Sequence, residues 1–265
     1  MDVPIYQVDA FAEKIFAGNP AAVCPLHEWL DDAVMQAIAA ENNLSETAFF
    51  VREGDDFKLR WFTPQSEVDL CGHATLASAF VLFNILAAQD SSIRFHTRSG
   101  VLTVSRDGGL ISMDFPSWPP EECPKPPASL EKALSPDRFI RSAAVLQGKS
   151  KYFVIYENEE QILDISPNFQ MLKTLHPFSV CVTAPGGESD FVSRYFVPSY
   201  GIPEDSVTGS THSSLVPYWS KRLNKGKLHA RQLSKRSGDL WCELKKDRVT
   251  LKGKAVLYLT GSISI

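Results

Sequence analysis

The chain has 265 residues, of which 44% are hydrophobic and 22% charged, and its formal net charge is −4. This length can bury the core of one large or two ordinary domains. The acidic balance and the absence of a long basic block argue against a dedicated nucleic-acid surface, because phosphate binding depends on clustered Lys and Arg. No apolar run approaches the roughly 20 residues that a membrane-spanning helix requires.

The beginning of the chain and its cysteines predict a cellular compartment. The chain opens on a strand-like segment rather than on a basic and apolar signal sequence, so we expect a cytoplasmic protein. Disulfide frameworks belong mainly to small secreted domains, and no two cysteines here are close in sequence. We therefore expect reduced thiols at Cys24, Cys71, Cys123, Cys181 and Cys242.

The first half of the chain reads as strands around two helices. The spacing of Val34 and Ile38 predicts a helix over residues 31–43. Residues 74–88 are almost wholly apolar, which predicts a second helix that is buried on nearly all sides. Alternation and β-propensity predict strands at residues 3–9, 21–24, 46–52, 57–62, 93–97, 100–106 and 110–115.

A proline-rich stretch at 116–127 cannot sustain a ladder or a helix, so it marks a connector. After it, a helix is predicted at 211–223 and strands at 152–156, 179–184, 191–196, 228–233, 240–244, 249–251 and 255–259. We expect two halves, each a sheet wrapped on one central helix. Their predicted bounds are 1–115, completed by a C-terminal strand at 257–265, and 116–256.

A near-repeat relates the two halves. The first copy is WFTP followed by CGHAT, within residues 61–75, and the second is YFVP followed by TGSTH, within residues 195–212. Each copy places a glycine, Gly72 or Gly209, where a helix is expected to begin. The first N–H groups of a helix lack partners and the dipole is positive there, so each start is an anion site. Two such starts could face one carboxylate-bearing ligand.

Two titratable residues are candidates for proton chemistry. Glu46 lies between a helix end and a buried-looking strand, where desolvation would raise its proton affinity toward neutral pH. His73 begins the apolar helix, where the dipole disfavours imidazolium, so we expect a neutral imidazole that donates a hydrogen bond or shuttles a proton. Each residue alone also has an ordinary interpretation as a capping or packed side chain.

Three further residues have weaker local signals. Asp205 precedes the second helix much as Asp69 precedes the first, although alone it would be a turn residue. Cys71 at a helix start could be acidified to a thiolate base, but its counterpart Thr208 argues against a two-thiol racemase, and a packed residue is favoured. Asn19 could fix a ligand carboxylate. We expect no metal site, because no ligand spacing joins His27, His96, His176 and His229.

Four blocks of sequence occur in order along the chain: DAF to GNPAAV at 9–23, NLSETAF at 43–49, RWFTP to CGHAT at 60–75 and EDSVTGS at 204–210. Together they resemble the phenazine-biosynthesis-like (PhzF-like) family. The resemblance extends from residue 3 to about 261, is weak at 116–174, and is similar at 67–73 and 218–220 to animal members known as MAWD-binding proteins. It implies an α+β, diaminopimelate-epimerase-like fold of two pseudo-symmetric halves, each a curved, mostly antiparallel, barrel-like sheet around a central helix, with the site between the halves.

The resemblance implies a cofactor-independent isomerase that moves a proton within a small carboxylated, anthranilate-like acid without a metal. Glu46 would take the proton from one carbon and return it at another, while His73 and Asp205 hold polar groups of the substrate. Two departures from the family pattern are Ser206, where a proline is usual, and the β-branched Thr211, where a small residue is usual. The substrate-binding residues implied are Asn19, Gly72, Gly209, Ser210 and Thr211.

Two other hypotheses stay open. In one, Cys71 is the base of an epimerase. In the other, the protein keeps the fold without turnover and serves as a protein-interaction module, in keeping with the animal-type resemblance. We expect a small carboxylated molecule as the ligand, a homodimer as the assembly and no nucleic-acid or membrane partner; the resemblance also allows a protein partner.

Overall fold

The chain folds into two compact units. The computed structural model describes residues 1–88, 90–138 and 140–265. The first unit comprises Met1–Asp114 with Thr250–Ile265, and the second comprises Phe115–Val249. The chain therefore returns to the first unit at Thr250, before the strand expected at 257–265. The reason is that the C-terminal strand pairs with the N-terminal strand from Ala255 onward.

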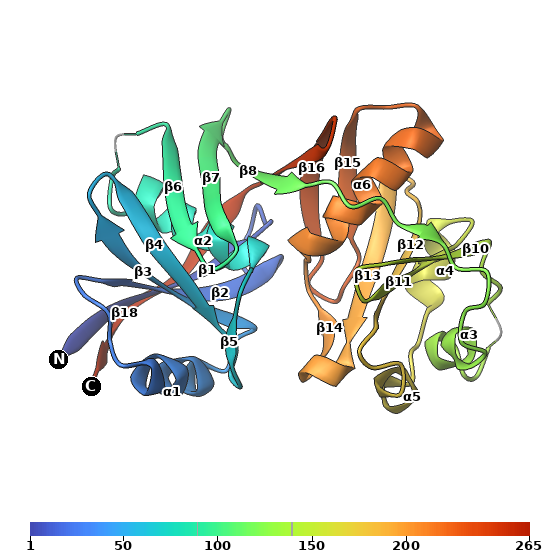
Figure 1. The fold of residues 1–265 in the computed structure, drawn as a ribbon, viewed down its shortest axis with the longest axis horizontal. Coiled ribbons are helices and arrows are strands. Elements are labelled where there is room, and N and C mark those ends of the chain that lie inside the picture. The colour runs from blue at the N-terminus through green and yellow to red at the C-terminus, as the bar shows by residue number, and fades with distance from the viewer. Residues whose placement is uncertain (89, 139) are drawn as a thin grey trace. The chain divides into compact units, whose positions relative to one another are not determined.

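The first unit contains nearly all of the strands that the sequence predicts for it, together with both helices (Figure 1). Strands β8 (Leu110–Pro116) and β17 (Arg248–Gly253) carry the chain from one unit into the other. The remaining elements are β1 (Asp2–Ala10), β2 (Asn19–Leu26), α1 (Asp32–Asn42), β3 (Glu46–Glu53), β4 (Asp56–Phe62), β5 (Glu67–Val68), α2 (Gly72–Asn84), β6 (Ser92–Thr97), β7 (Gly100–Asp107) and β18 (Ala255–Ser264).

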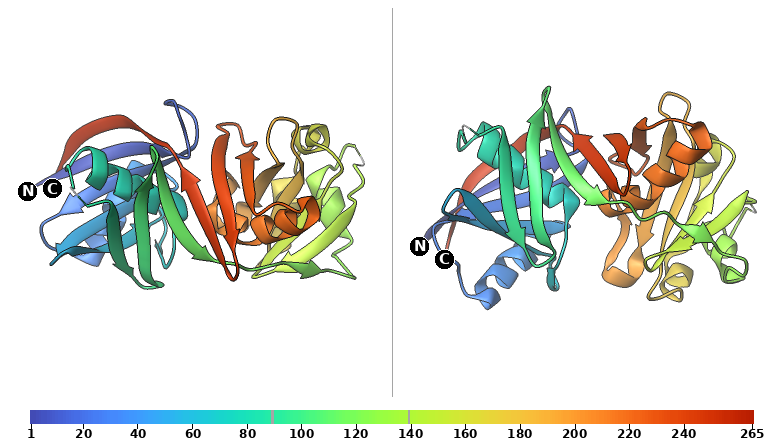
Figure 2. Two further views of the ribbon diagram at one scale, coloured as in Figure 1. Left: turned by 90° about the horizontal axis from the view of Figure 1, so that it is seen from above. Right: turned by 45° about the horizontal axis from the view of Figure 1, so that its top comes forward.

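The sheet of the first unit wraps around α2. Strand β1 pairs antiparallel with β2 and β18, so the two chain ends lie side by side (Figure 2). Strands β2 and β3 are parallel, β4 runs antiparallel to β3 and β5, and β4 and β6 are parallel. Helix α2 contacts β1, β2, β3 and β18, which explains why its sequence is apolar on nearly all sides.

Helix α2 is shorter than its apolar sequence predicts. It begins at Gly72 and ends at Asn84, whereas the apolar run continues to residue 88. The amides of Leu86 and Ala88 donate back to the carbonyls of Val81 and Leu82, and Ala87 adopts a positive φ of 52°. This left-handed residue ends the helix while the chain stays apolar.

The second unit contains more elements than the sequence predicts. Short helices occupy the weakly matched stretch, and α4 and α5 begin with Asn caps, in which the Asn158 and Asn168 side chains accept from backbone amides. The elements are β9 (Glu121–Glu122), α3 (Ser129–Leu134), β10 (Ala144–Gly148), β11 (Lys151–Ile155), α4 (Glu159–Asp164), α5 (Phe169–Lys173), β12 (Ser179–Pro185), β13 (Phe191–Val197), the 3₁₀ turn η1 (Pro198–Tyr200), β14 (Ile202–Asp205), α6 (Gly209–Leu223), β15 (Lys227–Gln232) and β16 (Gly238–Lys245).

The two units share one topology. In the second unit β11 and β12 are parallel, β13 runs antiparallel to β12 and β14, and β13 and β15 are parallel. This is the order and direction of β2 to β6 in the first unit, with α6 in the place of α2. The near-repeat in the sequence therefore marks the most similar part of a duplicated topology.

Helix α6 departs from the expected apolar central helix. Most of its residues are buried, yet Thr211, His212 and Ser213 are polar. Pro217 lies inside the helix and has no N–H to donate to the carbonyl of Ser213. The amide of Trp118, from the proline-rich connector, donates to that carbonyl at 2.8 Å. The connector thus supplies the donor for the Ser213 carbonyl that the proline cannot supply.

Two further findings concern the apolarity of the helices and the state of the cysteines. Within the described ranges, no helix combines the length and apolarity needed to cross a membrane. All five cysteines are free thiols. Four of them are buried, and Cys123 is half-buried.

Candidate active site

The two repeated helix starts have the same local architecture. Helix α2 begins at Gly72 after the N-cap Cys71, and α6 begins at Gly209 after the N-cap Thr208. Neither N-cap side chain caps the helix that follows. The prediction that each glycine begins a helix is confirmed. The first N–H groups of each helix donate no hydrogen bond to the N-cap side chain, so the positive end of the dipole is not capped by it.

In each unit a bidentate ion pair between an arginine and a glutamate joins the two strands that precede the central helix. Arg60 on β4 donates from Nε and Nη2 to the two carboxylate oxygens of Glu67 on β5, at 2.7 and 2.8 Å. Arg194 on β13 makes the same contact with Glu204 on β14, at 2.8 and 3.0 Å. Such forked pairs fix orientation as well as distance. The duplicated device therefore includes a matched ion pair in each unit.

Strand pairing corrects one expectation from the repeat. Tyr195 pairs with Asp205, and the equivalent Trp61 pairs with Val68 rather than with Asp69. Asp69 is exposed, and its carbonyl accepts from the Ser99 hydroxyl at 2.8 Å. Asp69 is therefore not the counterpart of Asp205 in the sheet: Val68 and Asp205 each lie four residues before the glycine that begins the helix, whereas Asp69 lies three residues before Gly72.

Glu46, His73, Cys71 and Asn19 come together in the first unit, as three of its elements converge at the start of α2. Nε2 of His73 lies 3.1 Å from Oε2 of Glu46, the first residue of β3. Nδ1 of the same ring lies 3.1 Å from Nδ2 of Asn19, the first residue of β2, and 3.5 Å from Sγ of Cys71. The exposed fractions of the His73 and Glu46 side chains are 6% and 15%. The pair is thus largely shielded from water.

The charge state of His73 differs from the expected neutral imidazole. Burial opposes the charged ring, but the interactions with Cys71, which include a hydrogen bond to its sulfur, and with the Glu46 carboxylate favour it, so the pKa of His73 is raised well above its ordinary value. The nearby carboxylate dominates over the helix dipole. The stabilisation from this pair is complete below about pH 6.5, the pKa of an unfolded histidine, and is lost as the pH rises through the raised pKa.

Asn19 is suited to both protonation states of His73. Its amide nitrogen can donate to Nδ1 of a neutral ring whose Nε2–H points at Glu46. An imidazolium has no acceptor, and a half-turn of the amide would then offer the oxygen of Asn19 to Nδ1–H. Asn19 is fully buried, so water cannot take over this task. Transfer of a proton between Glu46 and Nε2 leaves Nδ1–H on the ring, so the turned amide oxygen of Asn19 can accept from Nδ1–H before and after the transfer.

Cys71 is a buried thiol in this site. Burial, reinforced by the charge of Glu46, raises the pKa of Cys71 to about 11, although His73 acts in the opposite direction. A thiol with this pKa is protonated at neutral pH and is a poor base. The geometry therefore favours the packed-thiol interpretation over a thiolate base in the resting protein.

Glu46, Cys71 and His73 also form a donor set, since their ligand atoms lie within 4.8 Å of one another. The ring of His73, however, turns Nδ1 toward the sulfur and Nε2 toward the carboxylate. A zinc ion needs all its donors directed at one point, with a single nitrogen from each histidine. The three residues are arranged for hydrogen bonding to one another rather than for holding an ion.

In the second unit the candidate residues surround the start of α6. The Thr208 hydroxyl donates to Oδ2 of Asp205 at 2.5 Å. The fully buried Gln232 accepts from the Thr208 amide at 2.8 Å and donates to the Asp205 carbonyl at 2.7 Å. Sequence reasoning missed Gln232, because a glutamine in a strand carries no motif. The Thr211 hydroxyl donates to the carbonyl of Thr208, so this predicted binding residue is occupied within the first turn. Ser210 is half-buried beside it.

His212 occupies the same place in α6 that Thr75 occupies in α2. Its Nδ1 donates to the carbonyl of Thr208 at 2.8 Å, and the Thr75 hydroxyl donates to the carbonyl of Cys71 at 2.6 Å. Burial lowers the pKa of His212 to about 4, against the opposing effect of the hydrogen bond to Thr208. His212 is therefore neutral at pH 7 and has a structural role.

We expect His212 to make the protein sensitive to acid. The unfolded chain binds a proton at this residue near pH 6.5 and the folded chain only near pH 4, so unfolding becomes easier as the pH falls through that window, by about 3 kcal/mol. Urea unfolding between pH 4 and 7 should show a weaker pH dependence in His212→Gln than in wild type. The exposed His27→Gln should match wild type; an unchanged slope in His212→Gln would contradict the assignment.

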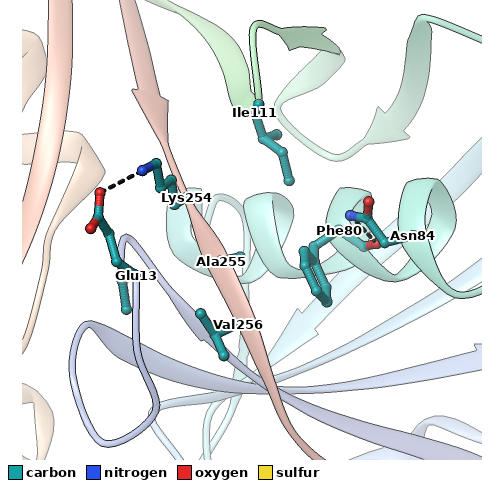
Figure 3. Close-up of a pocket in the computed structure, with 9 residues that line it drawn as sticks. Glu13, Phe80, Asn84, Ile111, Lys254, Ala255 and Val256 are labelled. Carbon is teal, nitrogen blue, oxygen red and sulfur yellow. Dashed lines mark hydrogen bonds and ion pairs between the residues drawn. The ribbon is translucent and has the colours of Figure 1, made fainter.

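A hollow on the outer side of α2 is a weaker candidate for a site. It has a volume of about 190 Å³ and is lined by Phe80, Asn84 and Ile111, among others (Figure 3). Its charged side chains, Glu13 and Lys254, form an ion pair with each other at 2.5 Å. The hollow therefore lacks the acid–base pair that the start of α2 provides.

Comparison with known sequences identifies close relatives of this chain. A family model described as phenazine biosynthesis-like protein matches residues 8–261. A Pseudomonas aeruginosa protein named as an uncharacterized isomerase is 51% identical over 265 residues, with 100% of both chains covered. The phenazine biosynthesis-like domain-containing protein of Homo sapiens is 39% identical over 290 residues, again with 100% of both covered. The similarity to animal members is present, but this bacterial relative shares more identical residues.

Solved structures show the same fold. A PhzF-family protein from Enterococcus faecalis has a TM-score of 0.95 and 47% identity, with 100% of both chains covered. A hydroxyproline epimerase from Agrobacterium vitis has a TM-score of 0.64 over 99% of this chain and 91% of its own, at 10% identity, so this similarity concerns the fold alone. The expected α+β, epimerase-like fold is confirmed.

Proposed function

Because the chain belongs to the family of phenazine biosynthesis-like proteins, we propose that it is an isomerase that moves a proton within a small carboxylated molecule. The names of its bacterial relatives support the isomerase class. The observation that carries the proposal is the contact between Glu46 and His73, at 3.1 Å, beside the uncapped start of α2. Few structural roles require a carboxylate and an imidazole that are both shielded from water.

In the proposed reaction Glu46 is the general base. Its carboxylate accepts a proton from a carbon of the substrate, and the neighbouring imidazolium of His73 stabilises the negative charge that develops. Glu46 then returns the proton to a second carbon, which completes the isomerisation without net gain or loss of protons. Backbone N–H groups near Gly72 would bind the substrate carboxylate at the positive end of α2.

We propose that Asp205 and Ser210 of the second unit hold polar groups of a small carboxylated ligand. Asp205 keeps its orientation through the Thr208 hydroxyl, which is itself held by Gln232. Backbone N–H groups near Gly209 offer a second anion position. The binding role of these residues stays a prediction, as does the homodimer, which sedimentation analysis of the purified protein would test.

The experiment follows deuterium from solvent into carbon positions of a metabolite extract by mass spectrometry. We expect wild type and Cys71→Ala to label the same compounds at rates within about threefold of each other, because the Cys71 thiol is protonated and not the base. Loss of labelling in Cys71→Ala, with His73 still charged by NMR, would support the epimerase alternative instead. Absence of labelling by wild type would favour the interaction module without turnover.

A further inference from the structure

The duplicated topology identifies which residue of the second unit stands where Glu46 stands in the first. Ala48 pairs with Trp61, and Cys181 pairs with Tyr195, which is the aromatic residue equivalent to Trp61. Glu46 and Ser179 lie two positions before those residues in β3 and β12. Ser179 is therefore the counterpart of Glu46, and the second unit has no carboxylate at that place.

The same comparison extends to the neighbouring strand. Ala21 pairs with Glu46 in the first unit, and Lys151 pairs with Ser179 in the second. Ala21 is fully buried, whereas Lys151 is half-buried at the beginning of β11. Across β11 to β14 the second unit thus has Lys151, Ser179, Tyr195 and Asp205, where the first has Ala21, Glu46, Trp61 and Val68.

These polar residues lie on the face of the sheet that carries α6. Thr183 and Phe191, on the same face of β12 and β13, contact Trp219 of α6 by a hydrogen bond of 3.0 Å and by ring stacking at 5.7 Å. Ser179 and Tyr195 lie on that face toward the other end of each strand, where Tyr195 pairs with Asp205. Their hydroxyls are 2.7 Å apart, and both residues are buried.

Lys151 is a cation without a carboxylate partner in the described part of the chain. Its Nζ lies 5.9 Å from the ring centroid of Tyr195, and the charged or ionisable groups that act on it are Cys181 and Lys149. Burial lowers the pKa of Lys151. Buried charges in proteins are normally paired, so this half-buried ammonium beside the Tyr195 ring lacks a counter-ion among the described residues.

We propose that Lys151 is a specificity-determining cation of the second unit, which binds a carboxylate or phosphate group of a small ligand beside the hydroxyls of Ser179 and Tyr195. The inference rests on the proposed function only for the class of ligand, a small molecule that carries an anionic group.

The test uses the whole protein and two probes, benzoate and inorganic phosphate. The side-chain ammonium signal of Lys151 in an NMR spectrum is assigned by its loss in Lys151→Met. We expect one probe to shift this signal, and Lys151→Met to weaken binding of that probe about tenfold or more, because a charge-assisted hydrogen bond is lost. Lys151→Arg should retain most of the affinity, since it keeps the charge.

Lys149→Met is the matched control. Lys149 is exposed two residues away, and its Nζ lies 3.4 Å from the ring centroid of Trp118, so we expect unchanged probe binding. The proposal fails if neither probe shifts the Lys151 signal of wild type, or if Lys149→Met weakens binding as much as Lys151→Met. A shift by benzoate alone identifies a carboxylate ligand, and a shift by phosphate alone identifies a phosphorylated one.

The two proposals fail separately, because probe binding requires no turnover. Glu46→Gln should bind the probes as wild type does, since Glu46 belongs to the first unit. Unchanged deuterium labelling in Glu46→Gln would overturn the proton chemistry and leave the Lys151 site standing. Unchanged probe binding in Lys151→Met would do the reverse.

Discussion

Replacing Glu46 by glutamine should lower the rate of solvent-deuterium incorporation by about 10²–10⁴-fold, which is the usual contribution of a general base. Glutamine has nearly the same shape, so it should preserve the packing around His73, but it cannot accept the proton. The same change removes the carboxylate that lies 3.1 Å from Nε2, so the pKa of His73 should fall. Mass spectrometry measures the first effect and an NMR titration of the imidazole the second.

Glu53→Gln is the matched control for this variant. Glu53 ends the strand that Glu46 begins, and its carboxylate pairs with Lys58 with about half of each side chain exposed, at 51% and 47%. We expect no change in labelling and none in the His73 titration. If Glu46→Gln labels the same compounds as wild type to the same extent, Glu46 is not the base. A loss of labelling without a lowered His73 pKa would show that the two residues act independently.

The helix starts were predictable because their signal is local. Glycine register located the N-caps Cys71 and Thr208, and the apolar run located α2. The polar sequence of α6 could not predict burial, because its burial depends on partners distant in sequence. The Trp118 amide donates to the Ser213 carbonyl, to which Pro217 cannot donate, and the Trp219 indole N–H donates to the Thr183 hydroxyl.

Properties that depend on strand pairing or on the balance of charges were beyond the sequence. The equivalence of Ala21 with Lys151 requires the register of the sheets. Predicting the charge of His73 requires the distance between its Nε2 and the Glu46 carboxylate, because the dipole of α2 and this carboxylate shift the pKa in opposite directions. Sequence alone lists both influences but cannot show which of them prevails.

Among single substitutions, the largest effect on stability is expected at the ion pair of Arg60 and Glu67. Their side chains are 19% and 12% exposed, and Arg60 also donates to Asp32 at 2.8 Å. Among the described residues, Arg60→Met leaves Glu67 with the more exposed Arg98 as its one ion-pair partner, at 2.7 Å. Breaking a fully buried pair costs about 3–5 kcal/mol, so for this partly exposed pair we expect a loss of about 2–3 kcal/mol in the free energy of unfolding. Urea denaturation measures it.

The exposed pair of Arg138 and Asp164 is the matched control, since its side chains are 73% and 48% exposed. Arg138→Met should cost less than about 0.5 kcal/mol, because exposed pairs contribute little. The double variant Arg60→Met with Glu67→Leu should recover much of the loss, since no carboxylate then remains without its partner. Equal losses in Arg60→Met and Arg138→Met would show that the forked pair is not what holds β5 against β4. The expected recovery in the double variant would show that the single variant is unstable because the Glu67 carboxylate has lost its partner. The matched ion pairs of the two units would then serve to position the helix starts more than to stabilise the fold.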